Sequence, residues 1–317
     1  MRICIGVITR NRKQMLSELL RSFEAMQVPE GCSLVYAIVE NDTQKSLEDV
    51  IPLLGGQHEV HYEIEPKPGI PAARNKVLEI SLREACDFTA FVDDDETVDA
   101  AWLVEIFKEL RTRELDLVGG PVRLHPAAKG ASFLNRIIWK GLVERNRRIE
   151  RKAAGHREAG SDNKVTVITS NWLIDNRFLT RTGIVFDEGL GMSGGSDTAF
   201  YKLARSLGVK SGWAPDALVY EEMPLSRLTM RYQFKRGRDQ SIASFHNKYK
   251  SASLNAALRT LVFCIFKIIG GLLLIVAIPF TGGRTLTLAA RNFGVALGRV
   301  YALVGHRSNH YKKVHGT

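Results

Sequence analysis

The sequence predicts an α/β fold with a largely parallel sheet, followed by an apolar helical tail. Short β-branched runs alternate with helical patterns over about the first 110 residues. The 317 residues are 45% hydrophobic, which is enough for one large domain with an appendage. Residues 261–280 contain a single charge, and their length is close to that needed to cross a bilayer.

The first part of the chain shows the elements of such a sheet in a regular order. Strands are expected at the four short apolar runs 3–9, 34–40, 60–65 and 88–92. Helices are expected at the three amphipathic runs 11–26, 71–85 and 100–110. Asn11 and Gln14 are predicted to form a capping box, and Pro71 lies near the first turn of the second helix.

The middle of the chain has a more irregular pattern. Residues 116–124 are typical of a bent strand, and residues 164–175 return to a strand pattern. Residues 195–208 are predicted to form a helix capped by Ser196 and ended by Gly208. Between these elements, residues 129–157 carry nine Lys or Arg and two Glu, interleaved with apolar residues that include Trp139.

The net charge of +10 is unevenly distributed along the chain. Residues 227–317 carry +14, whereas residues 1–226 carry −4. A basic segment of this kind favours an acidic partner, either nucleic acid or anionic lipid. Long apolar runs interrupt the basic tail, which argues against nucleic acid and for a membrane surface.

The cysteines and the N-terminus predict a cytosolic environment. The four cysteines form no C-x-x-C pair and lie near no histidine cluster, so neither a zinc site nor a disulfide framework is expected. The first apolar stretch is short and ends in Arg-Asn-Arg-Lys, which is unlike a signal peptide.

Three consecutive aspartates, Asp93, Asp94 and Asp95, follow the fourth predicted strand. Ligands of open parallel sheets bind beyond the carboxyl ends of the strands, where Thr9 and Glu40 are also expected. Adjacent carboxylates at such an edge suit Mg²⁺ or Mn²⁺, with phosphate oxygens completing the coordination. If the strand continued, Asp93 and Asp95 would point the same way. An acidic loop that caps the next helix would need only one Asp.

Asp197 follows two glycines at the start of the helix predicted at 195–208. It could simply stabilise the helix dipole, but the glycines would also let a substrate approach closely. The nearby G-x-G-x-x-G match at 189–194 does not indicate a dinucleotide site. Asp187 and Glu188 lead into it in place of a strand, and they would repel phosphate.

Seven motifs occur in the order that is typical of one enzyme family. They are VITRNR, VENDTQ, PGIPAARN, FVDDDE, TSNWLI, GGSDTAF and EEMPLSRLTMRYQFKRGR. Over about residues 1–245 the chain therefore resembles bacterial family 2 glycosyltransferases of the GT-A fold, close to the succinoglycan-type glucosyltransferases.

The resemblance implies a domain organisation and an activity. The GT-A domain would span 1–245, with a nucleotide-sugar-binding half at 1–115 and an acceptor half at 116–245; a membrane-associated helical tail would follow at 246–317. The enzyme would be inverting and metal-dependent. It would transfer a sugar from a nucleotide sugar, expected to be a UDP-sugar, to a lipid-linked saccharide or a polysaccharide precursor. This reaction is expected at the cytoplasmic face of the inner membrane.

The resemblance also implies roles for individual residues. Asp95 would bind the metal together with Asp93, and Asp93 would also contact the ribose. Ser196 stands in place of the family's Glu, which leaves Asp197 as the expected catalytic base. The implied donor-binding set is Thr9, Arg10, Arg12, Glu40, Asp42, Arg74, Asp93, Asp94 and Arg236. Within it, Glu40 stands where the family usually has an Asp that reads the base, and Arg10 replaces a frequent Tyr. Arg74 and Arg236 would either meet phosphate oxygens or form ordinary salt bridges.

Two other functions remain open at this point. A metal-dependent nucleotidyltransferase also uses paired aspartates, but it would release pyrophosphate in place of a nucleoside diphosphate. A nucleic-acid-binding protein would be retained on DNA in a salt-sensitive way and would not bind nucleotide sugars.

The tail is expected to dock on the membrane as a helical hairpin or a shallow interfacial pair formed by 261–280 and 285–304. A single crossing would place the basic residues that follow it on the outside, against the positive-inside tendency. Two full crossings would bury Lys267, Arg291 and Arg299, each at a cost of up to about 2.5–3.5 kcal/mol. Residues 129–157 would form either a second contact with anionic headgroups or a solvated helix near the acceptor cleft.

Overall fold

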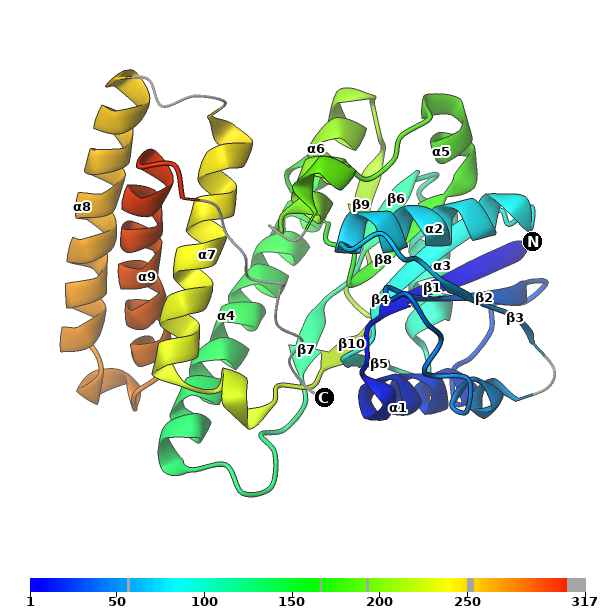
Figure 1. Ribbon diagram of the computed structural model, residues 1–317, viewed down its shortest axis with the longest axis horizontal. Coiled ribbons are helices and arrows are strands. Elements are labelled where there is room, and N and C mark those ends of the chain that lie inside the picture. Colours follow the sequence, from blue (N-terminus) through cyan, green and yellow to red (C-terminus); the bar gives the residue numbers. More distant parts are fainter. Residues whose placement is uncertain (56–57, 166, 192–193, 250–253, 307–317) are drawn as a thin grey trace.

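A computed structural model describes residues 1–55, 58–165, 167–191, 194–249 and 254–306. Within these residues a seven-stranded sheet has the order β3-β2-β1-β4-β8-β6-β9 (Figure 1). Its strands are β1 (Arg2–Thr9), β2 (Ser33–Glu40), β3 (Glu59–Ile64), β4 (Phe88–Asp93), β6 (Leu117–Gly119), β8 (Asn171–Asp175) and β9 (Ser211–Trp213). The first four pair in parallel, β8 runs antiparallel to β4 and β6, and β9 is parallel to β6. The predicted α/β class with a mostly parallel sheet is confirmed.

Helices cover both faces of this sheet. The helices are α1 (Lys13–Glu24), α2 (Ile70–Arg83), α3 (Trp102–Thr112), α5 (Asn176–Thr182) and α6 (Ser196–Ser206). Alternate residues of β1 enter opposite cores, as expected for a strand that is buried on both faces. Ile5 packs in the core that contains Leu16 of α1 and Trp102 of α3. Cys4 packs in the core that contains α2, α5 and α6.

A second, three-stranded sheet lies at the edge where the first four strands end. It consists of β5 (Glu96–Val98), β10 (Val219–Glu221) and β7 (Val122–Leu124), in that order. The segment predicted as one bent strand at 116–124 is thus divided between the two sheets, as β6 and β7. Antiparallel pairing of β10 with β5 sets Glu221 opposite Glu96. The small sheet therefore brings residues around 221 to the aspartates that follow β4.

Some local predictions were wrong. Helix α1 has Arg12 at its N-cap without a side-chain cap, and Asn11 adopts a φ of 51°, so the predicted capping box does not form. The N-cap of α6 is Gly195 at φ 87°, and Ser196 is already helical. The strand predicted over 164–175 begins only at Asn171. In each case the predicted element is present, but its start differs from the predicted one.

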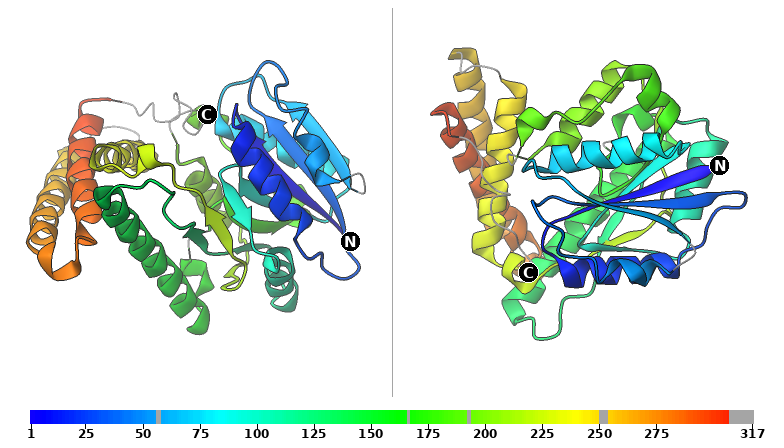
Figure 2. Two further views of the ribbon diagram at one scale, coloured as in Figure 1. Left: turned by 90° about the horizontal axis from the view of Figure 1, so that it is seen from below. Right: turned by 45° about the vertical axis from the view of Figure 1, so that its right-hand side comes forward.

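Four helices form a layer beside the sheet domain (Figures 1 and 2). They are α4 (Phe133–Glu158), α7 (Met230–Lys248), α8 (Leu254–Val276) and α9 (Thr285–Leu303). Helix α9 packs on the other three helices, and α8 is the outermost helix in the view of Figure 1. The division of the chain at 245/246 stays a prediction, because α7 extends across that point.

Glycines bring the backbones of α7 and α9 close together. A Cβ atom on Gly294 would lie 2.1 Å from the carbonyl oxygen of Phe234, and one on Gly298 would lie 2.2 Å from that of Arg238. On α4, a Cβ on Gly141 would lie 2.7 Å from the carbonyl oxygen of Arg284. Since real Cβ atoms do not approach backbone oxygens this closely, these positions need glycine. The last helix is therefore packed tightly onto the preceding part of the chain.

Helix α8 differs from the others in what it exposes. Within the described residues, Ala257–Val276 is the stretch long and apolar enough to cross a membrane, with a mean hydropathy of 2.2. Only 17% of that stretch is buried in the structure, which distinguishes it from the core helix of a soluble protein.

Candidate active site

The three predicted aspartates lie at the turn between β4 and β5. Asp93 is the last residue of β4, Asp94 and Asp95 form the turn, and β5 begins at Glu96. The strand alternation therefore stops at Asp93, and the premise that it continues to Asp95 was wrong. The turn gives each carboxylate a different set of partners.

Asp94 is held inside the protein by two of the predicted donor-binding residues. It is 4% exposed, and it accepts hydrogen bonds from Thr9 Oγ1 at 2.8 Å and Arg12 Nη1 at 2.6 Å. Burial raises the pKa of Asp94 to about 6, with the Asp95 charge adding to this effect and Arg12 opposing it. These contacts fasten the end of β1 to the turn after β4.

Asp95 is shared between two arginines. Its Oδ2 atom lies 3.1 Å from Arg227 Nη1 and 3.4 Å from Arg12 Nη1. Arg227 also lies 3.8 Å from Glu221 Oε1. The sequence did not single out Arg227 or Glu221, although both belong to the EEMPLSR motif. A fixed Glu-x-x-Pro-x-x-Arg spacing was the signal that could have identified them.

Asp93 faces the element that carries Asp197. Arg74 of α2 places Nη2 3.7 Å from Asp93 Oδ1, and its Nη1 donates to Ser196 Oγ at 3.2 Å. The guanidinium also lies over the ring of Phe186, 5.5 Å from the centroid. Burial raises the pKa of Asp93, and the charges of Asp95 and Asp197 raise it further while Arg74 opposes them. Arg74 thus links Asp93 to Ser196, the residue that precedes Asp197.

Two glutamates add to this negative charge. Glu96 is buried and accepts from the Asp93 amide at 2.9 Å; burial, followed by the charges of Asp93 and Asp95, raises its pKa well above the usual value. Burial and the Asp95 charge raise the pKa of Glu221 to about 7, with Arg227 opposing them. Carboxylates with raised pKa values favour a bound cation, because a cation stabilises their charged forms. Carboxylate oxygens of this kind are the ligands that a hard divalent metal prefers.

The other predicted donor residues lie at the ends of β1 and β2. Glu40 is buried, and its carboxylate accepts from the Ser46 amide at 2.9 Å and from the hydroxyls of Ser46 and Tyr62. Arg10 lies 3.9 Å from Asp42, and both side chains are partly exposed. Because Glu40 is engaged within the protein, its predicted contact with a base stays a prediction, as do the contacts of Arg10 and Asp42.

Arg236, the last predicted donor residue, lies on a different helix from Arg74. It is half-buried on α7. Its positive charge and that of Arg227 both oppose the rise in the pKa of Glu221. The two predicted phosphate-binding arginines therefore approach the carboxylate cluster from different elements, α2 and α7.

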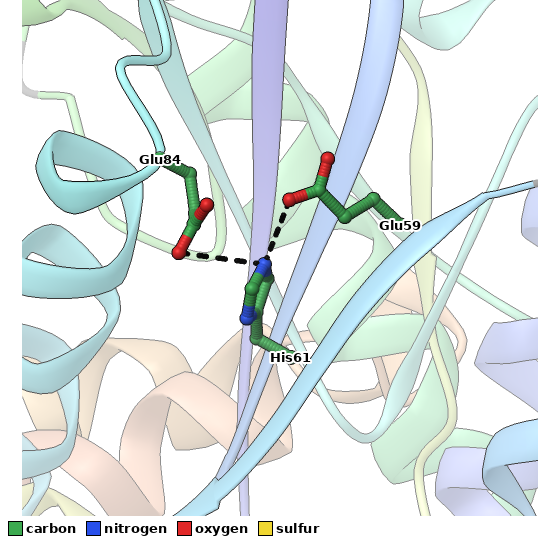
Figure 3. Close-up of side chains that lie close together, drawn as sticks. All are labelled: Glu59, His61 and Glu84. Atoms are coloured by element: carbon green, nitrogen blue, oxygen red, sulfur yellow. Dashed lines mark hydrogen bonds and ion pairs between the residues drawn. The ribbon is translucent and has the colours of Figure 1, made fainter.

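A second group of possible metal ligands lies at the other end of the sheet. Glu59, His61 and Glu84 place ligand atoms within 4.8 Å of one another (Figure 3). Glu59 is paired with Arg2 at 2.6 Å, and Glu84 is paired with Arg83 at 2.9 Å. This partly exposed group at the start of β3 is an ion-pair network, and it lies at the opposite end of the strands from Asp93.

Comparisons with known proteins agree with this geometry. A family model described as glycosyl transferase family 2 matches residues 4–177, more than half of the chain. The succinoglycan biosynthesis protein ExoM of Rhizobium meliloti (strain 1021) is 32% identical over 244 residues, which cover 74% of this chain and 71% of ExoM.

Solved structures of TarS from S. aureus share the fold. TarS 1–349 in complex with UDP superimposes with a TM-score of 0.51 at 14% identity, over 95% of this chain and 90% of that one. The complex of TarS 1–349 with UDP-GlcNAc gives a TM-score of 0.50 at 14% identity, over 77% of this chain and 66% of that one. At this level of identity the likeness supports the overall architecture alone.

Proposed function

The chain belongs to glycosyl transferase family 2, and from that premise we propose that it is an inverting, metal-dependent enzyme that uses a UDP-sugar. The observation that carries the proposal is the carboxylate cluster at the strand ends, where Arg74 links Asp93 to Ser196, the residue before Asp197. The TarS complexes with UDP and UDP-GlcNAc support a uridine donor for this chain. The likeness to a succinoglycan biosynthesis protein supports a lipid-linked saccharide or a polysaccharide precursor as acceptor.

The residues of the site suit the steps of a direct displacement. A divalent cation, Mg²⁺ or Mn²⁺, held by Asp95 and Asp93 would supply positive charge to the leaving diphosphate. Arg227 fixes the orientation of Asp95, and Arg74 can turn from Asp93 to a donor phosphate oxygen. Asp197 would accept the proton of the acceptor hydroxyl as it attacks the anomeric carbon. Attack from the face opposite the leaving group inverts that carbon.

We expect the free protein with Mn²⁺ to bind UDP more tightly than GDP. Thr9, Arg10, Glu40 and Asp42 stand at or directly after the ends of β1 and β2, where the base is proposed to bind. Isothermal calorimetry with UDP, GDP and each nucleotide in EDTA measures this preference and its dependence on the metal. Tighter binding of GDP would contradict the uridine assignment.

The exposed face of α8 is proposed to contact the membrane. Cys264 and Gly271 face α9, because the Cys264 thiol contacts Ala296 O at 3.4 Å and a Cβ on Gly271 would meet the ring of Phe293. The opposite side of the helix presents large apolar side chains with helical spacing: Leu258, Leu261, Val262, Ile265, Phe266, Ile269, Leu272, Leu273 and Val276. A continuous apolar face of this size marks an interaction surface.

A shallow position in the interface suits the packing better than a spanning hairpin. Arg291 donates to Gln233 and Gln240 of α7, and Arg299 donates to Ser244 of the same helix. These two arginines, which two full crossings would place in lipid, therefore face protein groups. Since α9 is packed on α7 and α4, we propose that α8 enters the headgroup region, from the cytoplasmic side that a nucleotide sugar requires.

The double variant Phe266→Glu/Leu273→Glu is expected to lose membrane binding. These side chains are 70% and 65% exposed, and burying each in the interface contributes about 1.5–3 kcal/mol. Flotation with phosphatidylglycerol–phosphatidylcholine vesicles compares this variant with the wild type and with Val185→Glu, which alters an exposed apolar residue of the sheet domain. We expect the wild type and Val185→Glu to float and the double variant to remain in the dense fraction. Flotation of the double variant at the wild-type level would contradict the assignment of α8.

A further inference from the structure

The start of α4 and the turn between α8 and α9 lie together at one end of the helical layer (Figure 1). A Cβ atom on Gly283, just after that turn, would lie 2.8 Å from Cγ2 of Ile137. Beside this contact, Thr287 Oγ1 of α9 donates to the carbonyl oxygen of Ile138 at 3.2 Å, although the two residues are 149 positions apart. Residues 132–140 and 279–284 therefore form one surface, which we call the tip.

Two phenylalanines of the tip are exposed to solvent. Phe133, the first residue of α4, is 81% exposed, and Phe280, in η5 (Pro279–Thr281), is 86% exposed. Within the described residues these are the two most exposed large hydrophobic side chains. Leu134 beside Phe133, and Leu273 and Val276 at the end of α8, are exposed as well. The rings thus belong to a wider apolar surface, which indicates a partner that buries them.

Hydrogen bonds hold the backbone that carries Phe133. Ser132 and Asn135 form a capping box, in which Ser132 Oγ accepts from the Asn135 amide at 3.2 Å. Asn135 Nδ2 donates in turn to the carbonyl oxygen of Leu228 at 2.7 Å. Leu228 directly follows Arg227, whose Nη1 lies 3.1 Å from Asp95 Oδ2. The tip is therefore joined through a short series of contacts to the aspartate turn of the candidate active site.

The charged side chains of the tip are all cations. Arg136 and Lys140 of α4 and Arg284 at the N-cap of α9 are exposed, and none of them forms an ion pair with a residue that the structure describes. Residues 124–143 and 270–306 contain no Asp or Glu. Exposed aromatic rings beside unpaired cations match a membrane with anionic headgroups. The rings enter the acyl boundary there, and the cations meet lipid phosphates.

A second copy of this chain is a poorer partner for the tip. A two-fold symmetric contact would bring the tip of one protomer against the same surface of the other. Arg136, Lys140 and Arg284 would then face like charges, and neither segment supplies a carboxylate to pair with them.

We propose that the tip is a second membrane contact, in which Phe133 and Phe280 insert into the anionic cytoplasmic leaflet beside α8. This inference rests on the proposed function, because it extends the membrane contact assigned there to α8. A single helix lying in the interface leaves the protein free to rotate about the helix axis. A contact from α4 removes that freedom, so the candidate active site takes a fixed orientation toward a lipid-linked acceptor.

The test measures partition of the full-length protein into phosphatidylglycerol–phosphatidylcholine vesicles and into pure phosphatidylcholine vesicles. The variants are Phe133→Ala/Phe280→Ala and Arg136→Gln/Lys140→Gln. The control for the first is Leu82→Ala/Val185→Ala, which alters two exposed apolar residues of the sheet domain. The control for the second is Arg147→Gln/Lys152→Gln, which removes two exposed cations further along α4.

We expect Phe133→Ala/Phe280→Ala to lower partition into the anionic vesicles at least about tenfold, because two rings no longer bury apolar surface. Arg136→Gln/Lys140→Gln should lower it by about fivefold for each cation and leave partition into neutral vesicles unchanged. Both controls should partition like the wild type. In a separate variant, Phe133→Trp, lipids brominated on their acyl chains should quench the added tryptophan emission, which reports insertion directly.

The outcomes separate the tip from α8. Unchanged partition of Phe133→Ala/Phe280→Ala, while Phe266→Glu/Leu273→Glu no longer binds, would leave the contact of α8 in place and overturn the role of the tip. Light scattering in mild detergent measures the oligomeric state of the wild type and of the phenylalanine variant. A dimer that this variant converts to a monomer would assign the tip to a second copy and also overturn the proposal. Failure of the wild type to bind either kind of vesicle would contradict the membrane contact of α8 together with this inference.

Discussion

Asp197→Asn is expected to lower the turnover number by roughly two to four orders of magnitude, the usual contribution of a general base. Asn keeps the shape of the side chain but cannot accept the proton of the acceptor hydroxyl. Asp197 lies in the first turn of α6, next to Ser196, which Arg74 contacts. The negative charge of Asp197 contributes to the raised pKa of Asp93. Because the substitution removes a group that acts in the chemical step, the KM for the donor should change little.

Asp187→Asn is the matched control for this prediction. Asp187 is an acid at the N-cap of η3 (Glu188–Leu190), on the segment that precedes α6, and it accepts from the Gly189 amide at 2.9 Å. It should therefore retain wild-type turnover. Initial rates of nucleoside diphosphate release at saturating donor compare the two variants. If Asp197→Asn also turns over at the wild-type rate, Asp197 acts only as an acid that stabilises the start of α6.

Asp95→Asn is expected to abolish metal-dependent transfer while the protein remains folded. The charge of Asp95 contributes to the raised pKa values of Asp94, Glu96 and Glu221, and Asp95 is the proposed ligand of the divalent cation. A neutral amide is a poor replacement for an anionic oxygen ligand, so both Mn²⁺ affinity and transfer should fall by about a hundredfold or more. Calorimetric titration with Mn²⁺ in the presence of UDP and an activity assay report the two effects separately.

Asp99→Asn controls for the loss of one negative charge near the same turn. Asp99 accepts from the Ala101 amide at 3.0 Å at the start of α3, and no role in metal binding is proposed for it. Circular dichroism should give the same folded spectrum for both variants and the wild type. Full activity of Asp95→Asn, or of the wild type in EDTA, would contradict the metal assignment.

The sequence predicted the elements whose signal is local and periodic. The first four strands are short apolar runs, and α2 has helical spacing with Pro71 in its first turn. These elements lie close to their predicted positions. The position of Asp93–Asp95 at a strand end followed from the same reasoning, because parallel strands bring their carboxyl ends to one edge.

The contacts of the site could not be predicted in this way, since they join residues that are far apart in the chain. Arg227 and Asp95 are 132 positions apart in the sequence. The strand that brings them together, β10, has three residues, which is too short for a periodic pattern to predict it. Ser196 was expected to cap a helix, but it accepts a hydrogen bond from Arg74. Glu40 was expected to face a base, whereas Ser46 and Tyr62 engage it within the protein.

The tail illustrates the same limit. Composition alone predicted an apolar helix at 261–280. It also predicted that burying Arg291 and Arg299 in the bilayer would cost free energy. The structure shows that these arginines face α7, and that glycines such as Gly294 allow the close approach on which those contacts depend. Helix pairing of this kind depends on small residues that hydropathy does not reveal.

The most direct test of the proposed activity identifies the product that leaves the nucleotide. The purified full-length protein is incubated with a panel of radiolabelled UDP-sugars, Mn²⁺ and a lipid extract that contains lipid-linked saccharides, and the released nucleotide is separated by anion-exchange chromatography. We predict release of UDP that requires the metal and Asp197, together with transfer of the labelled sugar to the lipid fraction. Release of pyrophosphate in place of UDP would identify a nucleotidyltransferase and contradict the account.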